Sequence, residues 1–334
     1  MSRKKLTGLE PFEYEHPLDK AALEKLEAIP GVKSILKKLH EVWFEKISYI
    51  DNAGSSLIVT EENLPKIYKL LLEACSILDI QKIPPLYIQN DTTYSINAYT
   101  SGIHTPYIVI NTHAIEALDD LELLALIGHE LGHIKSGHVL YSSIARQFNT
   151  YFKKLGSLTL GLANLATLPA EAIDIAMNYW HRMSELTCDR AGLLACADID
   201  VAVTSIIKMA GFPSNDCSRI SYLNINDFIE SFKNQAREFQ DFETDEFNKL
   251  LRFRATNLQS HPWLVLRVAE LYKWIDSGNF DRIIKRERTL IDDQDKYKIK
   301  SIPLNSKFCP NCGANISSSS KFCSGCGTKV NEET

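Results

Sequence analysis

The chain has 334 residues and a formal net charge of −5, with 45% hydrophobic and 24% charged residues. This composition is that of an ordinary globular protein, long enough for one large domain and one small one. The lack of a net positive charge argues against nucleic acid as its principal partner.

The first third of the chain predicts helices and then strands. Its N-terminal residues contain no apolar run of the kind found in secretion signals, so we expect a cytoplasmic protein. Helical patterning extends over 18–48 and 64–78, and strand-like runs cluster over 86–110. Further helical patterns follow at 140–210, 225–257 and 262–276. The order of these elements predicts a mostly helical α+β domain with one small sheet.

The motif His129-Glu130-x-x-His133 is the most informative feature of the chain. On a helix, positions i and i+4 lie on one face, so both imidazoles can bind one metal ion. Glu130 is rotated by about 100° from His129, which keeps it off the metal and leaves it free to act as a general base. Residues 119–127 begin with acidic side chains and continue without Pro or Gly, which favours the required helix. The alternative, a core helix with two surface histidines, would interrupt an apolar stretch without compensation.

The best candidate for a membrane-spanning helix is the uncharged run from Leu155 to Ala170, which is sixteen residues long and is diluted by Gly, Ser, Thr and Asn. A membrane-spanning helix needs about 20 predominantly apolar residues. We therefore expect a buried helix, or one that touches a membrane surface, and no span.

A second candidate for metal binding lies on the predicted helix that follows. Glu185 and Asp189 stand at i and i+4 and so share one helix face. Glu185 could complete a three-ligand zinc site, while Asp189 could accept a hydrogen bond from the outer nitrogen of a ligand histidine. The alternative is an ordinary solvated face of charged residues.

The C-terminal residues contain two Cys-x-x-Cys pairs, and Lys-Phe-Cys-x-x-Cys-Gly recurs after fourteen residues. Four thiolates at this spacing predict a closed structural zinc site, formed by Cys309, Cys312, Cys323 and Cys326. A segment this short has too little core to fold without metal. The alternative, a pair of disulfides, suits a secreted chain. We expect a domain over 1–290, a polar linker over 291–306 and a zinc ribbon over 307–334.

Taken in order, the motifs resemble those of the zinc metallopeptidases grouped around the bacterial protease HtpX and the CAAX prenyl endopeptidases, which are gluzincins. In that family HExxH on one helix is followed by Glu-x-x-x-Asp on another, beside one small sheet. By this resemblance His129, His133 and Glu185 hold the catalytic zinc, Glu130 is the base and Asp189 supports a ligand histidine. The resemblance covers about 60–275. His138 also matches a recurring position, although a surface or supporting histidine would explain it equally well.

Two further segments carry the resemblance. Asn97-Ala98-Tyr99 is similar to the family's Asn-Ala-Phe segment, which lies beside the active-site cleft and implies contacts with an extended substrate. A plain hairpin is the alternative for this segment. His261, in Ser-His-Pro, matches the family's Thr-His-Pro motif and is implied to stabilise the oxyanion, and Arg267 is implied to pair with the acidic helix.

These observations predict a zinc endopeptidase that acts on peptide or protein substrates and contains one catalytic and one structural zinc. The best-known members of the family that it resembles are integral membrane proteins, so membrane association stays possible. Two other functions remain open. One is a catalytically latent zinc-binding adaptor that uses the ribbon to bind a protein partner, and the other is a zinc hydrolase of a non-peptide amide.

Overall fold

The computed structural model describes six main stretches, which are 3–29, 54–90, 96–102, 105–142, 170–209 and 264–285. Shorter pieces are Asp227, 230–232, 234–236, 307–308 and 315–316. The chain divides into two compact units, Met1–Lys285 and Arg286–Thr334. The predicted linker, all four ribbon cysteines, His261 and the uncharged run up to residue 169 lie outside the described residues.

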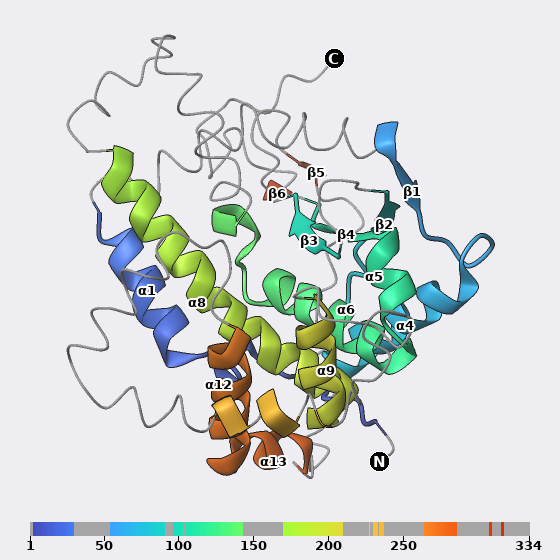
Figure 1. The fold of residues 1–334 in the computed structure, drawn as a ribbon. Coiled ribbons are helices and arrows are strands. Elements are labelled where there is room, and N and C mark those ends of the chain that lie inside the picture. The colour runs from blue at the N-terminus through green and yellow to red at the C-terminus, as the bar shows by residue number, and fades with distance from the viewer. Residues whose placement is uncertain are drawn as a thin grey trace. The chain divides into compact units, whose positions relative to one another are not determined.

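The described part of the larger unit is mostly helical with one small sheet, as predicted (Figure 1). Its helices are η1 (Pro11–Glu13), α1 (Pro17–Glu27), α4 (Pro65–Ile77), α5 (Thr112–Ala117), α6 (Asp120–Lys135), α8 (Ala170–Cys196), α9 (Ile199–Met209), α12 (Leu264–Asp276) and α13 (Asn279–Ile284). Its strands are β1 (Ser56–Ile58), β2 (Leu86–Gln89), β3 (Ala98–Ser101) and β4 (Tyr107–Asn111). The second unit contains the antiparallel pair β5 (Lys307–Phe308) and β6 (Asn315–Ile316).

The four-stranded sheet has the order β1-β2-β4-β3. Its central pair, β2 and β4, is parallel, whereas β1 and β3 pair antiparallel to their neighbours. Every residue of β4 is buried, as the inner strand of a covered sheet requires. β3 is the end strand on the side of α6, so the segment at 97–99 lies at a sheet edge next to the HExxH helix.

Helix α6 begins with a capping box. The Asp119 carboxylate accepts hydrogen bonds from the backbone N–H groups of Leu121 and Glu122, both at 2.9 Å, and Glu122 accepts from Asp119 N–H at 2.8 Å. The buried Glu122 carboxylate also pairs with Lys208 of α9 at 2.8 Å. The acidic start that the sequence shows is therefore a specific cap as well as a favourable charge at the helix N-terminus.

Small residues let α6 and α8 cross at close range. A Cβ atom on Gly128 would collide with Ala195, and one on Gly132 would lie 2.8 Å from the Cβ of Ala191. From the other side, a Cβ on Gly192 would lie 2.8 Å from the carbonyl oxygen of Ala125. Because the backbones approach this closely, side chains next to these glycines on the two helices can meet across the crossing.

The N-terminal helix α1 lies along α8 (Figure 1). It buries Ala22 and Leu26 in a second hydrophobic cluster, whose other members are Tyr141, Met177, Trp180, Met183 and Leu186. The N-terminal segment is therefore part of the domain core, beside the helix that carries Glu185.

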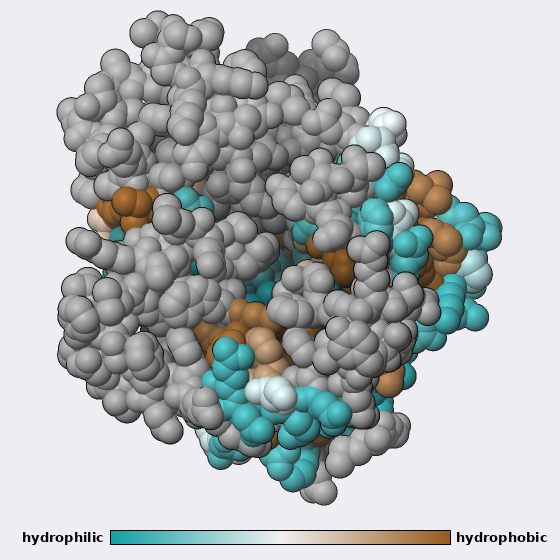
Figure 2. Space-filling view, viewed as in Figure 1, coloured by the Kyte–Doolittle hydropathy of each residue, from teal (hydrophilic) through white to brown (hydrophobic). Residues whose placement is uncertain are grey.

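Within the stretches that the structure describes, no helix is both long and apolar enough to cross a membrane. On the face drawn in Figure 2, hydrophobic and hydrophilic described residues lie next to one another. The exposed large hydrophobic side chains come from several elements and include Phe12, Leu57, Ile83 and Ile175.

Candidate metal centre

Two histidines of α6 and one glutamate of α8 converge at the helix crossing. The Nε2 atom of His129 lies 3.5 Å from one carboxylate oxygen of Glu185, and the Nε2 atom of His133 lies 3.3 Å from the other. All three side chains are buried. Both imidazoles thus turn the same nitrogen toward a single carboxylate, an arrangement that could surround a metal ion.

Asp189 and Arg267 hold the far side of the His129 ring. The Nδ1 atom of His129 is 3.0 Å from Oδ1 of Asp189, which also accepts from Arg267 Nη2 at 2.5 Å. Arg267 Nε donates to the other oxygen at 2.8 Å. Burial alone would raise the pKa of Asp189, but Arg267 and His129 hold it below its ordinary value. An ionised carboxylate only accepts hydrogen bonds, so Nδ1 of His129 keeps its proton and Nε2 is the nitrogen that can exchange its proton for a metal.

The His133 ring has a different partner. Its Nδ1 atom lies 3.3 Å from Nδ1 of His138, whose Nε2 atom lies 3.1 Å from Asp19 of α1. Thr187 donates to the same Asp19 oxygen at 2.6 Å. His138 is 2% exposed and is therefore a buried supporting residue, one of the two possibilities that the sequence left open. Nothing in the sequence singles out Asp19, which looks like any acidic residue in the first turn of a helix.

Thr100 of β3 contacts the expected general base. Its hydroxyl donates to Oε2 of Glu130 at 2.6 Å, and both side chains are buried. The neighbouring predicted substrate residues are half-buried at the sheet edge. Asn97 N–H donates to the Asn111 side chain, and Tyr99 donates to Gln89. Sequence reasoning did not single out Thr100, because it depends on the pairing of β3 with the sheet and on the approach of α6.

The charges around the crossing fit a divalent cation. Three buried carboxylates lie here, those of Glu130, Glu185 and Asp189, and Arg267 pairs with the last two. Burial opposes a charge on His129, but Asp189 and Glu185 outweigh it and raise the pKa of His129 to about 10. A site that stabilises a protonated ring so strongly also stabilises a metal cation in its place.

Cys188 is a competing donor. One possible ligand atom from each of His129, His133 and Cys188 lies within 4.8 Å of the others. Burial raises the pKa of the Cys188 thiol well above its ordinary value, however, and metals bind the thiolate. The Sγ atom instead contacts His138 Nδ1 at 3.6 Å. Glu185, which both Nε2 atoms face, is the better third ligand.

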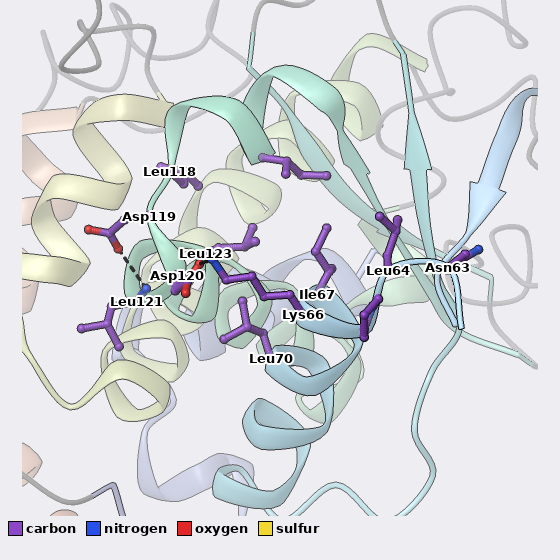
Figure 3. A pocket seen from close by; sticks show the side chains of 12 residues that line it. Asn63, Leu64, Lys66, Ile67, Leu70, Leu118, Asp119, Asp120, Leu121 and Leu123 are labelled. Carbon is purple, nitrogen blue, oxygen red and sulfur yellow. Dashed lines mark hydrogen bonds and ion pairs between the residues drawn. The ribbon is translucent and has the colours of Figure 1, made fainter. Parts of the chain in front are cut away.

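A separate open groove of about 740 Å³ lies between the beginnings of α4 and α6 (Figure 3). It is lined mainly by apolar side chains, including Leu64, Ile67, Leu70, Leu118 and Leu123. None of the residues that line it belongs to the HExxH or Glu-x-x-x-Asp motifs.

Comparison with known proteins identifies both parts of the chain. Residues 65–275 match the model described as Peptidase family M48, and residues 301–330 match a zinc-ribbon domain. The chain is 34% identical over 281 residues to the plastoglobule-localized metallopeptidase 48, chloroplastic, of Arabidopsis thaliana, which covers 83% of this chain and 76% of that protein. It is 28% identical to a Protease HtpX homolog of Helicobacter pylori over 66% of this chain and 69% of that protein. A Bacteroides fragilis homolog is 34% identical over 36% of this chain and 38% of its own length.

Proposed function

Because the chain belongs to peptidase family M48 and is a zinc metalloprotease, we propose that it is an endopeptidase whose active site is the crossing of α6 and α8. In this proposal His129, His133 and Glu185 hold the catalytic zinc. The observation that carries the assignment is that both imidazoles direct Nε2 toward the Glu185 carboxylate, at 3.5 and 3.3 Å. These donors, two imidazoles and a carboxylate, are a ligand set of catalytic zinc sites.

We assign the proton transfers to Glu130. Zinc, when bound, polarises the scissile carbonyl and lowers the pKa of water toward about 7. The Glu130 carboxylate takes a proton from the attacking water and returns it to the leaving amine. Thr100 occupies Oε2 with its hydroxyl, which fixes the carboxylate and leaves Oε1 as the oxygen that exchanges the proton. Glu130 lies next to a ligand in the sequence but points to a different partner, as its role requires.

We place the substrate along β3. In the described sheet β3 is the end strand and lies next to α6, and main-chain hydrogen bonds along such a strand are a common way to bind an extended peptide. Asn97, Ala98 and Tyr99 would then contact the substrate. His261 is proposed to stabilise the oxyanion. That assignment is supported by the Ser-His-Pro motif, and the residue lies outside the described part of the chain.

We further propose a structural zinc in the C-terminal ribbon and a cytoplasmic location. The ribbon proposal is supported by the zinc-ribbon match and by the spacing of its four cysteines, Cys309, Cys312, Cys323 and Cys326. The location is supported by Cys75, Cys188 and Cys196, which are buried free thiols, since reduced thiols suit a reducing compartment. A protein partner could bind the ribbon.

The test compares wild-type protein with Glu130→Gln and His133→Ala on an unfolded protein substrate, with metal analysis of each. We expect two zinc ions in wild type and in Glu130→Gln, whose cleavage should fall by about 10²–10⁴-fold or more. His133→Ala should lose one zinc. Near-normal cleavage by Glu130→Gln would refute the mechanism.

The same experiment separates the other two functions. An adaptor would bind both zinc ions without cleaving any substrate. A hydrolase of non-peptide amides would cleave a small acyl amide and leave the protein substrate intact, again in a manner that depends on Glu130.

A further inference from the structure

The segment Tyr14–Asp19, which we call the N-terminal strap, connects the three helices of the metal centre. The Tyr14 hydroxyl contacts Ser136 at the end of α6, at 3.1 Å. Arg190 of α8 donates to the carbonyl oxygen of Tyr14 at 3.2 Å. The Nε2 atom of His16 lies 3.0 Å from Glu270 of α12. The strap is therefore fixed to every helix that contributes a side chain to the centre.

The end of the strap reaches the His133 side of the centre through Asp19. Asp19 is 1% exposed, and its Oδ2 atom is near both His138 Nε2 and the Thr187 hydroxyl. The other oxygen, Oδ1, is buried without a hydrogen-bond partner among the described residues. A buried carboxylate with one unsatisfied oxygen is costly, so its presence here calls for an explanation beyond packing.

The positions of the protons follow from these contacts. Burial would raise the pKa of Asp19, but His138 and Thr187 hold it below its ordinary value, so the side chain is an acceptor only. His138 must then carry a proton on Nε2. In the neutral ring its Nδ1 is an acceptor. It faces two donors, the Nδ1–H group of His133 at 3.3 Å and the Cys188 thiol at 3.6 Å, of which the ring N–H is the stronger donor. This leaves the Nε2 lone pair of His133 free, on the side that faces Glu185.

We propose that Asp19 is a positioning residue that acts through His138 to fix the tautomer and orientation of His133. The inference rests on the proposed role of His133 as a zinc ligand. Asp19 and the rest of the strap lie before residue 65, where the family match begins. The N-terminal segment therefore completes the metal centre from outside the matched domain.

The test measures the affinity of full-length protein for zinc at this site by competition with a chromophoric chelator. His133→Ala identifies which of the bound zinc ions belongs to the centre. Asp19→Leu and Asp19→Asn keep the branched skeleton of the aspartate side chain, but only asparagine keeps an acceptor oxygen. We expect Asp19→Leu to weaken zinc binding roughly 10- to 100-fold, the scale for residues that support a ligand, and Asp19→Asn to restore most of the loss.

A double-mutant cycle with His138→Ala tests the route. If Asp19 acts through His138, Asp19→Leu should add little to the loss caused by His138→Ala, whereas additive losses would overturn the proposal. Tyr14→Phe is the matched control, since it removes a strap hydrogen bond that does not lead to His133, and it should bind zinc like wild type. Melting of the zinc-free proteins shows whether each variant is folded.

Two results overturn the proposal. In one, folded Asp19→Leu binds zinc as tightly as wild type. In the other, Tyr14→Phe weakens binding as much as Asp19→Leu does, which would make the strap a general support. If His133→Ala removes no zinc from the wild-type count, the proposed function fails instead, independently of Asp19.

Discussion

The two histidines of the metal centre are supported by different parts of the molecule. His129 is hydrogen-bonded to Asp189 of α8, and Arg267 donates two hydrogen bonds to the same carboxylate. His133 contacts a second imidazole, that of His138, and the His138 ring contacts Asp19 of the N-terminal helix. Each of these two series of hydrogen-bonded side chains includes a buried carboxylate that only accepts hydrogen bonds, so each can set the tautomer of its histidine.

The difference between these two supports lies in their origin. The support of His129 falls entirely within residues 65–275, the stretch that matches the peptidase family, whereas that of His133 ends on Asp19, outside it. A domain boundary drawn at the family match would therefore separate His133 from the residue that we propose to orient it. The direct carboxylate support should also be the stronger of the two, because a charged acceptor touches the ligand itself.

Of the substitutions that test this comparison, Asp189→Asn should cause the largest loss of zinc affinity and stability. The amide offers a donor where the carboxylate accepted from both His129 and Arg267, so one of these contacts becomes repulsive. We expect zinc affinity to fall roughly 10- to 100-fold and the unfolding free energy to fall by about 3–5 kcal/mol, because a buried guanidinium loses its partner. Chelator competition and denaturant unfolding measure the two effects.

The comparison fails if Asp19→Leu weakens zinc binding more than Asp189→Asn does. Arg267→Lys serves as the control on the same support. It keeps the charge but loses the bidentate contact, so it should lose stability while keeping more zinc affinity than Asp189→Asn.

The support of His129 could be predicted from the sequence, whereas that of His133 could not. The positions of Glu185 and Asp189 follow from a helical spacing of four residues, and a local pattern of this kind fixes which side chains share a face. Asp19 and Thr100 meet the centre through packing of distant segments. In addition, neither Asp nor Thr at those positions departs from what an ordinary helix or strand would contain.

The fold shows the same division. The strand-like runs before α6 and the helix itself could be predicted, because periodicity and capping residues are local. The close crossing of α6 and α8 could not, since a glycine beside a histidine shows its function only when the facing alanine is known. Gly128 and Gly132 therefore help to form the site by allowing α8 to approach, a role that the motif alone does not reveal.

Gly132→Ala should disturb both supports at once. The added Cβ would lie 2.8 Å from the Cβ of Ala191, and backbone of α8 is 3.2 Å away at Cys188, so the helices must move apart. We expect a loss of about 1–3 kcal/mol in unfolding free energy, the scale for overpacking a core, together with weaker zinc binding. Gly137→Ala, where no atom would lie within 4 Å, tests for effects of positive φ instead of packing. Unchanged melting of Gly132→Ala would show that the crossing adapts.

A smaller loss of stability should follow from removing the charge of Glu270, the residue of α12 that His16 of the strap contacts. The pKa of Glu270 is lowered to about 2, because hydrogen bonds from His16 and Lys273 outweigh the opposing effect of burial. A depressed carboxyl pKa stabilises the fold above the ordinary value of 4.5, and that stability is lost as the pH falls toward 2. Glu270→Gln should therefore be less stable than wild type by about 1–2 kcal/mol at pH 6, with the gap closing below pH 4.5.

This comparison requires protein from which a chelator has removed the zinc, because the zinc ligands also lose their metal in acid. Tryptophan fluorescence during urea unfolding at several pH values measures the gap. Burial lowers the pKa of His16, so the buried ring adds a separate loss of stability below pH 6.5. A gap of constant size down to pH 2 would mean that Glu270 is not a charged anchor of the strap.

The smallest effect on peptide cleavage should come from deleting 301–334, which includes the matched zinc-ribbon region 301–330. Neither support of the ligand histidines includes a residue of this region, and His129, His133 and Glu185 lie in the other compact unit. We therefore expect kcat/KM for a short unstructured peptide to stay close to wild type and the zinc count to fall by one. Cleavage of a folded or large protein substrate could still weaken, because a tethered binding module raises the local concentration of its ligand.

The measurement is kcat/KM for one peptide and one protein, with and without the ribbon, and the zinc content of both forms. A truncated enzyme that is folded, retains the centre's zinc and cannot cleave the peptide would show that the ribbon completes the active site. Faster peptide cleavage after truncation would show instead that the ribbon restricts access to the centre.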